Sequence, residues 1–302
     1  MMKQIFILVS SILLFSISAL AGEFTFEYQK IIDVTSDHVN IDLTMFKGKV
    51  TVIGSNSDRV IIDAVKTIRA SNRDEAEEVA DHIEIKVADN SANLIIETNY
   101  LKMINRSQSF WTKFLGSSDS EAYGQVDYYI QVPPQTSVKI NSMEAIVEVA
   151  SLEGNVDIKN NSGLFRAEYV YGSVTVSQPV GMIDLNWIEG DIRIKSNSSK
   201  INIKQLMGAI DLATYSGEVH IETELESPKD YYIETTSGAV TFSVPTSAAG
   251  ALNVRTETGN IKTEFPVTVK SVSRKNFIGN FGAGGPTINI VSTTGDVEVS
   301  EF

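Results

Sequence analysis

Glycine recurs every nine residues through the second half of the chain, and this spacing constrains the fold more than any other feature. The glycines of this register are Gly154, Gly163, Gly172, Gly181, Gly190, Gly208 and Gly217, and Ser199 takes the one remaining position among them. The second and fourth residues after each position are apolar, which is the alternation of a short strand with one buried face. A fixed period of this kind is typical of stacked repeats, in which each unit buries its apolar side against its neighbours.

The full repeat is eighteen residues long, because two kinds of corner alternate along the register. Two residues before each position, apolar residues such as Val170 and Ile188 alternate with residues such as Asn161 and Pro179. Counted in both directions and across insertions, the register covers residues 131–302 and predicts eight stacked coils. Each coil would have two short strands and two corners, so we expect an all-β solenoid that resembles a β-helix.

The first residues of the chain have the pattern of a secretory signal peptide at 1–21. Lys3 precedes an apolar run over 5–17, and a small-x-small cleavage site ends at Ala21, before Gly22. The alternative is a membrane anchor, for which the apolar run is short. We therefore expect an exported protein of a bacterial envelope, located in the periplasm, at the cell surface or outside the cell.

Composition excludes several classes of function. The sequence has no cysteine, so it can form no disulfide and use no thiol chemistry. Its formal net charge of −13 opposes binding to nucleic acid and to anionic membrane surfaces. After residues 1–21 the chain has no second long apolar run, so we expect no membrane span once the signal peptide is removed.

Residues 22–130 follow the repeat less strictly and should contain one helix. Gly48 falls on the nine-residue register, which indicates that coil-like strands begin in this part. Ser71 or Asn72 can cap a helix over about 72–86, which has acidic residues in its first turn and a narrow apolar stripe. We expect this amphipathic helix to cover an end or a flank of the sheet, because open sheet edges recruit other strands.

Residues 103–123 are predicted to form an inserted loop between two strands. The loop is polar except for an aromatic cluster that contains Phe110, Trp111 and Phe114. Exposed aromatic residues in a polar loop can form the contact surface for a partner. They can equally form an apolar plug over the first coil, and the sequence leaves both interpretations open.

The sequence contains no recognisable catalytic, metal or cofactor motif. His38, His82 and His220 lie far apart, and their spacing matches no zinc site. The glycine-rich stretch 279–285 leads into a strand, so it lacks the helix N-terminus that a phosphate-binding loop needs. We therefore predict no catalytic residue, no metal and no cofactor.

Charged residues on the outward side of the repeats have mixed signs. The eighteen-residue repeat places Arg166 beside Asp184, and Arg193 beside Asp211, on neighbouring coils. Calcium-binding nonapeptide repeats need an Asp in every turn, so this pattern argues against a calcium site. It favours ladders of ion pairs, each of which contributes a few tenths to about 1 kcal/mol of stability.

One group of aromatic residues should face outward on neighbouring coils. If Val170 and Ile188 point into the core, then Tyr169, Tyr171 and Trp187 point away from it. Such a patch could stack on the sugar rings of a glycan. The alternative is that these surface aromatics stack only on one another and stabilise the solenoid.

Four motifs occur in a fixed order along the chain, together with repeated Gly-x-Val/Ile-x-Val/Ile units. They are the Gly-Lys-Val-Thr-Val strand at 48–52, the acidic helix at 75–81, the strand at 128–133 that ends in Val-Pro, and Thr-Thr-Gly-Asp-Val at 293–297. In this order they resemble the bacterial putative-adhesin family, also called domain of unknown function 4097, over most of the mature chain. The resemblance implies an extracytoplasmic β-solenoid, and it offers no family catalytic residues to transfer.

These observations favour a non-enzymatic protein of the cell envelope that binds or scaffolds, as an adhesin does. Its partner would be an envelope glycan or another envelope protein. The alternative is an enzyme that acts on polysaccharide, because stacked β-coils can host such sites. A carboxylate cluster with a shifted pKa in a groove would favour the enzyme, whereas a smooth rod with charge ladders would favour the binding protein.

Overall fold

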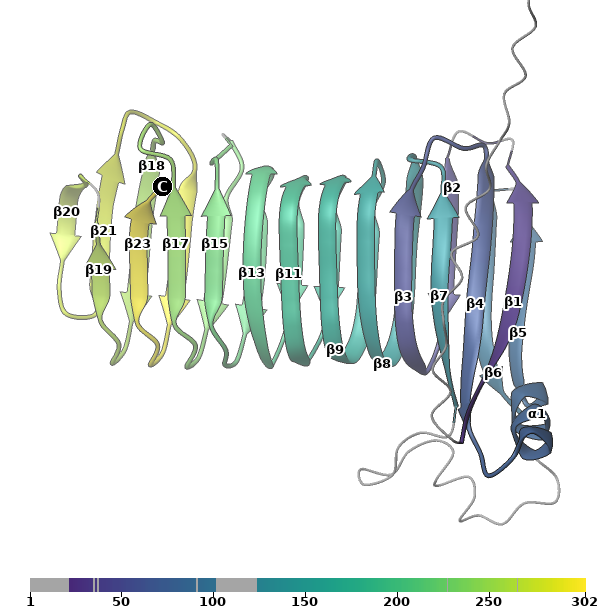
Figure 1. Cartoon of the computed structure of the whole chain (residues 1–302). Helices are drawn as coiled ribbons and strands as arrows, with labels where there is room; N and C mark the ends of the chain where they lie inside the picture. Colours follow the sequence, from purple (N-terminus) through teal and green to yellow (C-terminus); the bar gives the residue numbers. More distant parts are fainter. Residues whose placement is uncertain are drawn as a thin grey trace, which may run out of the picture.

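The computed structural model describes residues 22–34, 36, 38–90, 92–101, 124–226, 228–264 and 266–302. The predicted signal peptide at 1–21 and the predicted loop residues Phe110, Trp111 and Phe114 lie outside the described residues. Within the described ranges the chain consists of strands and one short helix, which confirms the predicted all-β solenoid (Figure 1).

The strands form two layers that share one apolar core, and β8 and β9 each run through a corner from the first layer into the second. In order along the rod, the first layer contains β5 (Ile83–Asn90), β6 (Asn93–Tyr100), β2 (Val39–Thr44), the first halves of β8 (Thr136–Leu152) and β9 (Val156–Tyr171), β10 (Val174–Ser177), β12 (Ile192–Lys195), β14 (Ile210–Thr214), β16 (Tyr231–Thr235), β22 (Thr287–Ser292), β18 (Gly250–Thr256), β21 (Asn276–Phe281) and β20 (Thr268–Val272).

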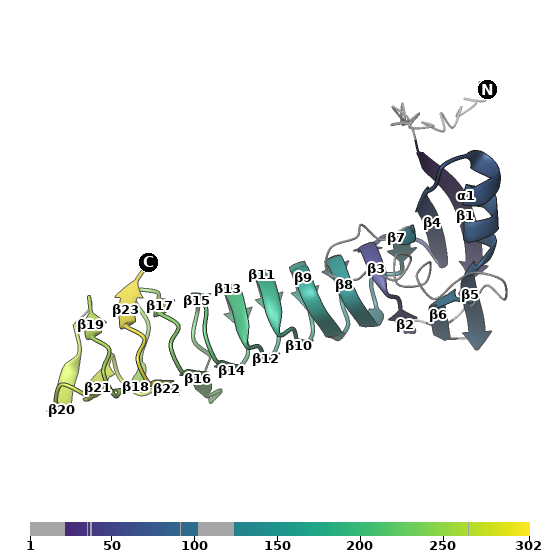
Figure 2. The same cartoon turned by 90° about the horizontal axis from the view of Figure 1, so that it is seen from below.

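The second layer follows the same axis. In order along the rod, it contains β1 (Glu23–Asp33), β4 (Arg59–Arg69), β7 (Gly124–Val132), β3 (Lys47–Gly54), the second halves of β8 and β9, β11 (Val180–Glu189), β13 (Ser198–Met207), β15 (Val219–Thr223), β17 (Val240–Val244), β23 (Val297–Glu301) and β19 (Ile261–Thr263). Figure 2 shows the resulting row of coils, with α1 at one end and β20 at the other.

From β8 to β15 the coils repeat every eighteen residues in parallel register, as the glycine spacing predicts. Ile192 is the register partner of Ile210, and each side chain is 1% exposed. The two residues therefore stack in one inward column, as the eighteen-residue repeat requires. Because inward and outward residues alternate, a slip of one residue would expose the whole apolar side of a strand, so burial fixes the register.

The stacking order of the coils differs from their order in the chain at the C-terminal end. The last coil, β22–β23, lies between the coil β16–β17 and the coil β18–β19. Tyr231 is thus the register partner of Ile288, and Ile288 is also the partner of Leu252. Phe302, which follows β23, is therefore not at the tip of the rod. The hairpin β20–β21 forms the tip instead (Figures 1 and 2).

A similar rearrangement occurs at the N-terminal end. The coil β2–β3 lies between β6–β7 on one side and β8 on the other. Ile41 pairs with Leu94 in one direction and with Val138 in the other. Beyond these coils, β5 extends the first layer, and β4 and then β1 extend the second layer, all through antiparallel pairs.

The helix α1 (Arg73–Asp81) is shorter than the predicted 72–86. Asn72 caps it, because its side chain accepts a hydrogen bond from the backbone N–H of Glu75 at 2.9 Å. The helix ends early because Ile83 starts β5, whose pairing with β6 outweighs helix propensity. The side chains that α1 buries against the strands are Ala76, Val79 and Ala80. In the described ranges no helix is long and apolar enough to cross a membrane.

Lysine residues protect the four open edges of the layers. Lys86 in β5, Lys262 in β19 and Lys270 in β20 are exposed on edge strands, and Lys270 also sits at a β-bulge. In β1, Lys30 instead reaches across the open end and donates a hydrogen bond to the carbonyl of Val87 in β5 at 3.0 Å. Edge lysines and bulges oppose the addition of further strands, so both ends of the rod are built against edge-to-edge association.

Candidate functional site

Each coil turns at two corners that differ in character. The first corner leads from the first layer to the second, as at 160–163, and the second corner leads onward to the next coil, as at 169–172. The upper ends of β9 and β11 in Figure 1 lie at the second corner. The predicted ligand residues Tyr169, Tyr171 and Trp187 all lie there.

The second corner is formed by a ladder of left-handed residues that are not glycine. Ser151, Tyr169 and Trp187 have backbone φ values of 58°, 55° and 57°. The pairing of β8 with β9 and of β9 with β11 passes over all three, so neighbouring coils have the same additional residue at the same point and keep their register. Only against β13 is Trp187 the extra residue of a β-bulge. The additional left-handed residue lets two consecutive side chains face outward, as Glu168 and Tyr169 do.

The backbone at these positions does not favour aromatic residues. A left-handed conformation costs a residue with a side chain about 1–2 kcal/mol, and glycine or asparagine would avoid most of this cost. Ser151 occupies the same position in the preceding coil, so the corner itself does not require a ring. Tyr169 and Trp187 are therefore present despite the local conformation, which is a pattern common at functional sites.

The predicted orientation of the aromatic residues is confirmed. The exposed fractions of Tyr169, Tyr171 and Trp187 are 50%, 52% and 47%, whereas Val170 and Ile188 are fully buried. None of the three rings makes a ring contact with another aromatic residue of the described chain. The surface they form, which we call the aromatic corner, is thus accessible from outside the rod.

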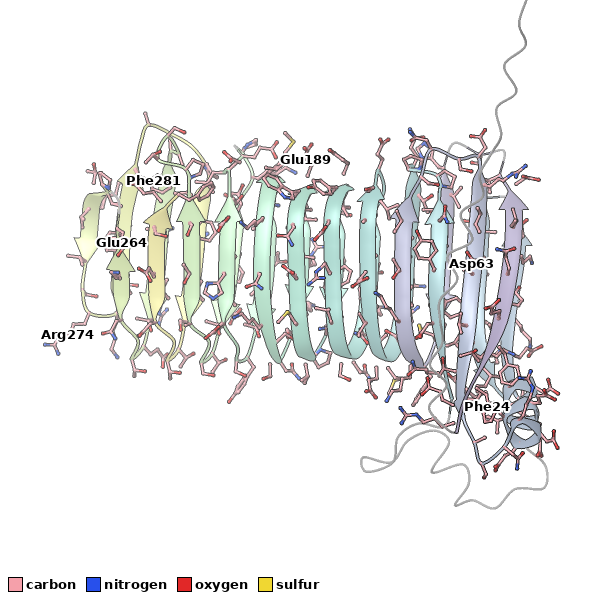
Figure 3. The ribbon with its side chains drawn as sticks, viewed as in Figure 1. Phe24, Asp63, Glu189, Glu264, Arg274 and Phe281 are labelled. Carbon is pink, nitrogen blue, oxygen red and sulfur yellow. The ribbon has the colours of Figure 1, made fainter. Side chains whose placement is uncertain are left out.

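Three carboxylates surround the aromatic corner without partners of their own. Glu189 is the register partner of Tyr171, Glu168 directly precedes Tyr169, and Glu153 precedes Tyr171 by one repeat. Figure 3 shows the Glu189 side chain at the upper edge of the rod. Within the described residues, none of these three carboxylates forms an ion pair or a side-chain hydrogen bond. The aromatic corner is therefore negatively charged.

The ladder of rings ends after Trp187 because the side chain eighteen residues later points into the core instead of outward. Gln205 takes the equivalent position and is 2% exposed. Its side-chain amide donates hydrogen bonds to the carbonyls of Gly190 at 2.8 Å and Ala209 at 3.2 Å. Positive φ moves to Gly208, at 118°. The aromatic corner is consequently limited to two neighbouring coils.

The first corner is closed by buried polar side chains, which the glycine register alone does not predict. The Asn160 amide donates to the Ala145 carbonyl at 3.0 Å and to Gln178 Oε1 at 3.3 Å, and the Ser142 hydroxyl donates to Asn160 Oδ1 at 3.0 Å. The position three residues before the corner glycine or its substitute is polar in every coil from β8 onward: Ser142, Asn160, Gln178, Ser196, Thr214, Thr235, Thr256 and Ser292. This regularity is visible in the sequence.

The predicted charge ladders are confirmed on the flat faces of the rod. Arg166 Nε lies 3.3 Å from Asp184 Oδ2, and Arg193 Nε lies 3.5 Å from Asp211 Oδ2. These side chains are partly or largely exposed, so each pair adds at most about 1 kcal/mol of stability. These ion pairs distinguish the flat faces of these coils from the aromatic corner, whose carboxylates have no such partner among the described residues.

A groove of about 400 Å³ lies on the outer side of the first layer, where β6, β2 and β8 adjoin. Its polar groups already bind one another. Lys139 Nζ is 2.6 Å from Asp42 Oδ2, and the Asn40 amide donates to Asn93 Oδ1 at 3.0 Å. A ligand would have to break these contacts, so this groove is a weaker candidate than the aromatic corner.

The described residues show no group of side chains that could hold a metal ion. His38 precedes β2, His82 follows α1 and His220 lies in β15, and no group of three or more acidic or histidine side chains in the described ranges could bind a metal together. Hydrogen bonds from the Ala209 N–H and from Lys200 lower the pKa of Asp191 and Glu218, respectively. A general acid at neutral pH needs a raised pKa instead.

Part of the chain matches a known protein family. Residues 188–300 match the family model Toastrack DUF4097. The predicted resemblance to domain of unknown function 4097 is confirmed in this region, which runs from the end of β11 to β23. The Toastrack match begins one residue after Trp187, so the aromatic corner lies just outside it. No curated protein matches the sequence.

The chain is also similar to solved structures. A "putative cell adhesion protein" from Clostridium sporogenes is 11% identical, with 92% of this chain and 100% of that chain covered and a TM-score of 0.29. A "putative adhesin" from Bacteroides fragilis is 12% identical, with 92% and 97% covered and a TM-score of 0.32. A "putative lipid binding protein" from Parabacteroides distasonis is 11% identical, with 90% and 96% covered and a TM-score of 0.30. At such low values, what those proteins do does not transfer to this chain.

Proposed function

We propose that this protein is a non-enzymatic binding protein of the bacterial envelope, and that its aromatic corner holds an extended glycan. One observation supports this most strongly. Tyr169 and Trp187 expose about half of their side chains from left-handed positions that Ser151 shows can be filled without a ring. Exposed rings kept at a conformational cost indicate a use outside the fold itself.

The geometry suits a chain of sugars that runs along the rod. Aromatic side chains combine an apolar face with a polar tip, which matches the apolar faces and hydroxyl groups of sugar rings. Neighbouring parallel strands are about 4.8 Å apart, so a polymer that follows the rod axis meets Tyr169 and then Trp187. The signal-peptide pattern at 1–21 supports a location outside the cytoplasm, where such polymers occur.

The test is a retention experiment with the exported protein on purified cell-wall and capsule fractions. We expect Trp187→Asn to abolish retention, because it removes the ring and keeps a residue that tolerates positive φ. Tyr215→Asn is the matched control, since Tyr215 is 65% exposed but lies at the first corner. Equal retention of wild type and Trp187→Asn would contradict the proposal, and so would failure of the wild type to bind.

A further inference from the structure

We infer that the glycan at the aromatic corner carries positive charge, in the form of free amino groups on its sugars. The inference rests on the proposed function and names the chemical class of its ligand. The rings of Tyr169, Tyr171 and Trp187 form the surface, and the charge around them selects what can lie on it.

The carboxylates at this surface differ from those on the rest of the rod. Elsewhere on the central coils, most outward carboxylates lie within ion-pair distance of a basic side chain on a neighbouring coil, although Asp157 and Glu224 do not. These pairs are Asp184 with Arg166 at 3.3 Å, Asp211 with Arg193 at 3.5 Å, Glu218 with Lys200 at 3.2 Å, and Glu222 with Lys204 at 3.0 Å. By contrast, Glu153, Glu168 and Glu189 have no such partner among the described residues.

The fold places these three carboxylates at positions that neighbour the aromatic residues in the chain or in the strand register. Strand alternation turns Glu168 outward directly beside Tyr169, and strand pairing sets Glu189 against Tyr171. Glu153 lies one coil before Tyr171 on the same ridge. A ligand that covers the rings must therefore pass close to all three negative charges.

Polysaccharides can be acidic, neutral or positively charged. The carboxylates around the rings make the acidic and the neutral classes unfavourable as the preferred ligand. An acidic polymer would be repelled by these carboxylates and by the net charge of −13. A neutral polymer would gain nothing from them and would leave them without partners. Protonated amines gain twice, because they attract carboxylates and also the negative faces of aromatic rings. A chain of hexosamines with free amines therefore fits this surface best.

The test compares two ligands of equal length that differ in charge. Calorimetric titration would measure Kd for a β-linked hexamer of glucosamine and for the hexamer of N-acetylglucosamine, at a pH where the free amines are protonated. We expect the amine hexamer to bind about three- to tenfold more tightly, which is the effect of one or two exposed charge pairs. The double variant Glu168→Gln/Glu189→Gln should remove this preference while it retains binding of the acetylated hexamer.

A matched control removes the same number of charges away from the rings. Asp211→Asn/Glu218→Gln should leave the preference for the amine hexamer intact, and an equal loss in both double variants would overturn the inference. Equal binding of the two hexamers by the wild type would also overturn it, yet would leave the proposed function standing. Tighter binding of hexalysine than of the amine hexamer would replace the glycan by a basic peptide and likewise overturn the inference. Retention on cell-wall material, tested separately with Trp187→Asn, decides the proposed function.

Discussion

The two corners of the solenoid are made from the same eighteen-residue repeat, yet they are opposite in almost every property. At the first corner, polar side chains point inward and bind one another and the backbone, as Asn160 and Gln178 do. At the second corner, Tyr169 and Trp187 point outward and their carboxylate neighbours lack partners. The comparison indicates that one corner holds the coils together and that the other is free to carry a ligand.

The residue that has positive φ also differs between the two corners. At the first corner, Gly181 has φ of 128°, and a Cβ atom there would lie 1.9 Å from the carbonyl oxygen of Gly163 in the preceding coil. Glycines pack as closely at the second corner, where a Cβ atom on Gly190 would lie 2.2 Å from the carbonyl oxygen of Gly172. The two corners differ instead in which residue has positive φ. At the first corner it is the glycine itself, and at the second corner it is Tyr169 or Trp187, whose rings extend into solvent.

The largest change in the free energy of unfolding is expected when an inward residue of the second corner is truncated, and a neighbouring outward residue provides the comparison. Ile188→Ala should lower the free energy of unfolding by about 2–5 kcal/mol, because Ile188 is fully buried. Trp187→Asn, one residue earlier, should cost less than about 1.5 kcal/mol, because relief of the left-handed strain offsets the lost contacts of a half-exposed ring. Chemical denaturation of both variants measures this, and equal costs would show that Trp187 is a core residue.

An intermediate effect is expected at the first corner. Asn160→Ala should cost about 1–3 kcal/mol, because it leaves the Ser142 hydroxyl, the Ala145 carbonyl and Gln178 Oε1 without this partner in a buried site. Asn161→Ala is the control, since Asn161 is exposed, and it should change stability by less than about 0.5 kcal/mol. Similar denaturation midpoints for the two variants would mean that the polar ladder does not hold the coils together.

The smallest effect is expected on the flat faces. Asp211→Asn should cost less than about 1 kcal/mol, because its ion pair with Arg193 is largely exposed and screened by water and salt. Thermal unfolding at low and high salt would measure the difference, which should shrink as salt is added. A cost that persists at high salt would point to a structural role for this ladder beyond charge pairing.

The sequence predicts the repeat unit well because alternation and glycine spacing act locally. The stack of Ile192 on Ile210, the pairing of Arg166 with Asp184 and the outward rings all follow from an eighteen-residue coil. The stacking order at the ends does not follow, because every coil presents a similar apolar column. Ile288 fits beside Tyr231 as well as Leu252 would, so periodicity contains no information about which coil lies next.

The composition of the candidate site was also only partly predictable. The eighteen-residue repeat identifies Tyr169 and Trp187 as outward, but nothing in their identity indicates positive φ, since aromatic residues disfavour it. The repeat already places Arg166 beside Asp184, and it places no basic residue beside Glu168, whose neighbours eighteen residues away are Ala150 and Asn186. The unpaired state of Glu168 could therefore have been predicted from the repeat. The predicted end of the helix at 86 was wrong, because the pairing of Ile83 with Tyr100 is a long-range contact that the local pattern does not show.

The position of β22–β23 between two earlier coils has a consequence for how the molecule is made. A ribosome delivers β16–β17 first, then the residues of β18–β21, and the strands that separate these two groups come last. The coil β18–β19 thus has no finished surface to join until β22 and β23 have emerged. We expect a product that stops before Pro286 to keep its apolar columns open at this point and to be a target for proteolysis. The far end of the rod therefore depends on β22–β23 for its attachment to the rest of the solenoid.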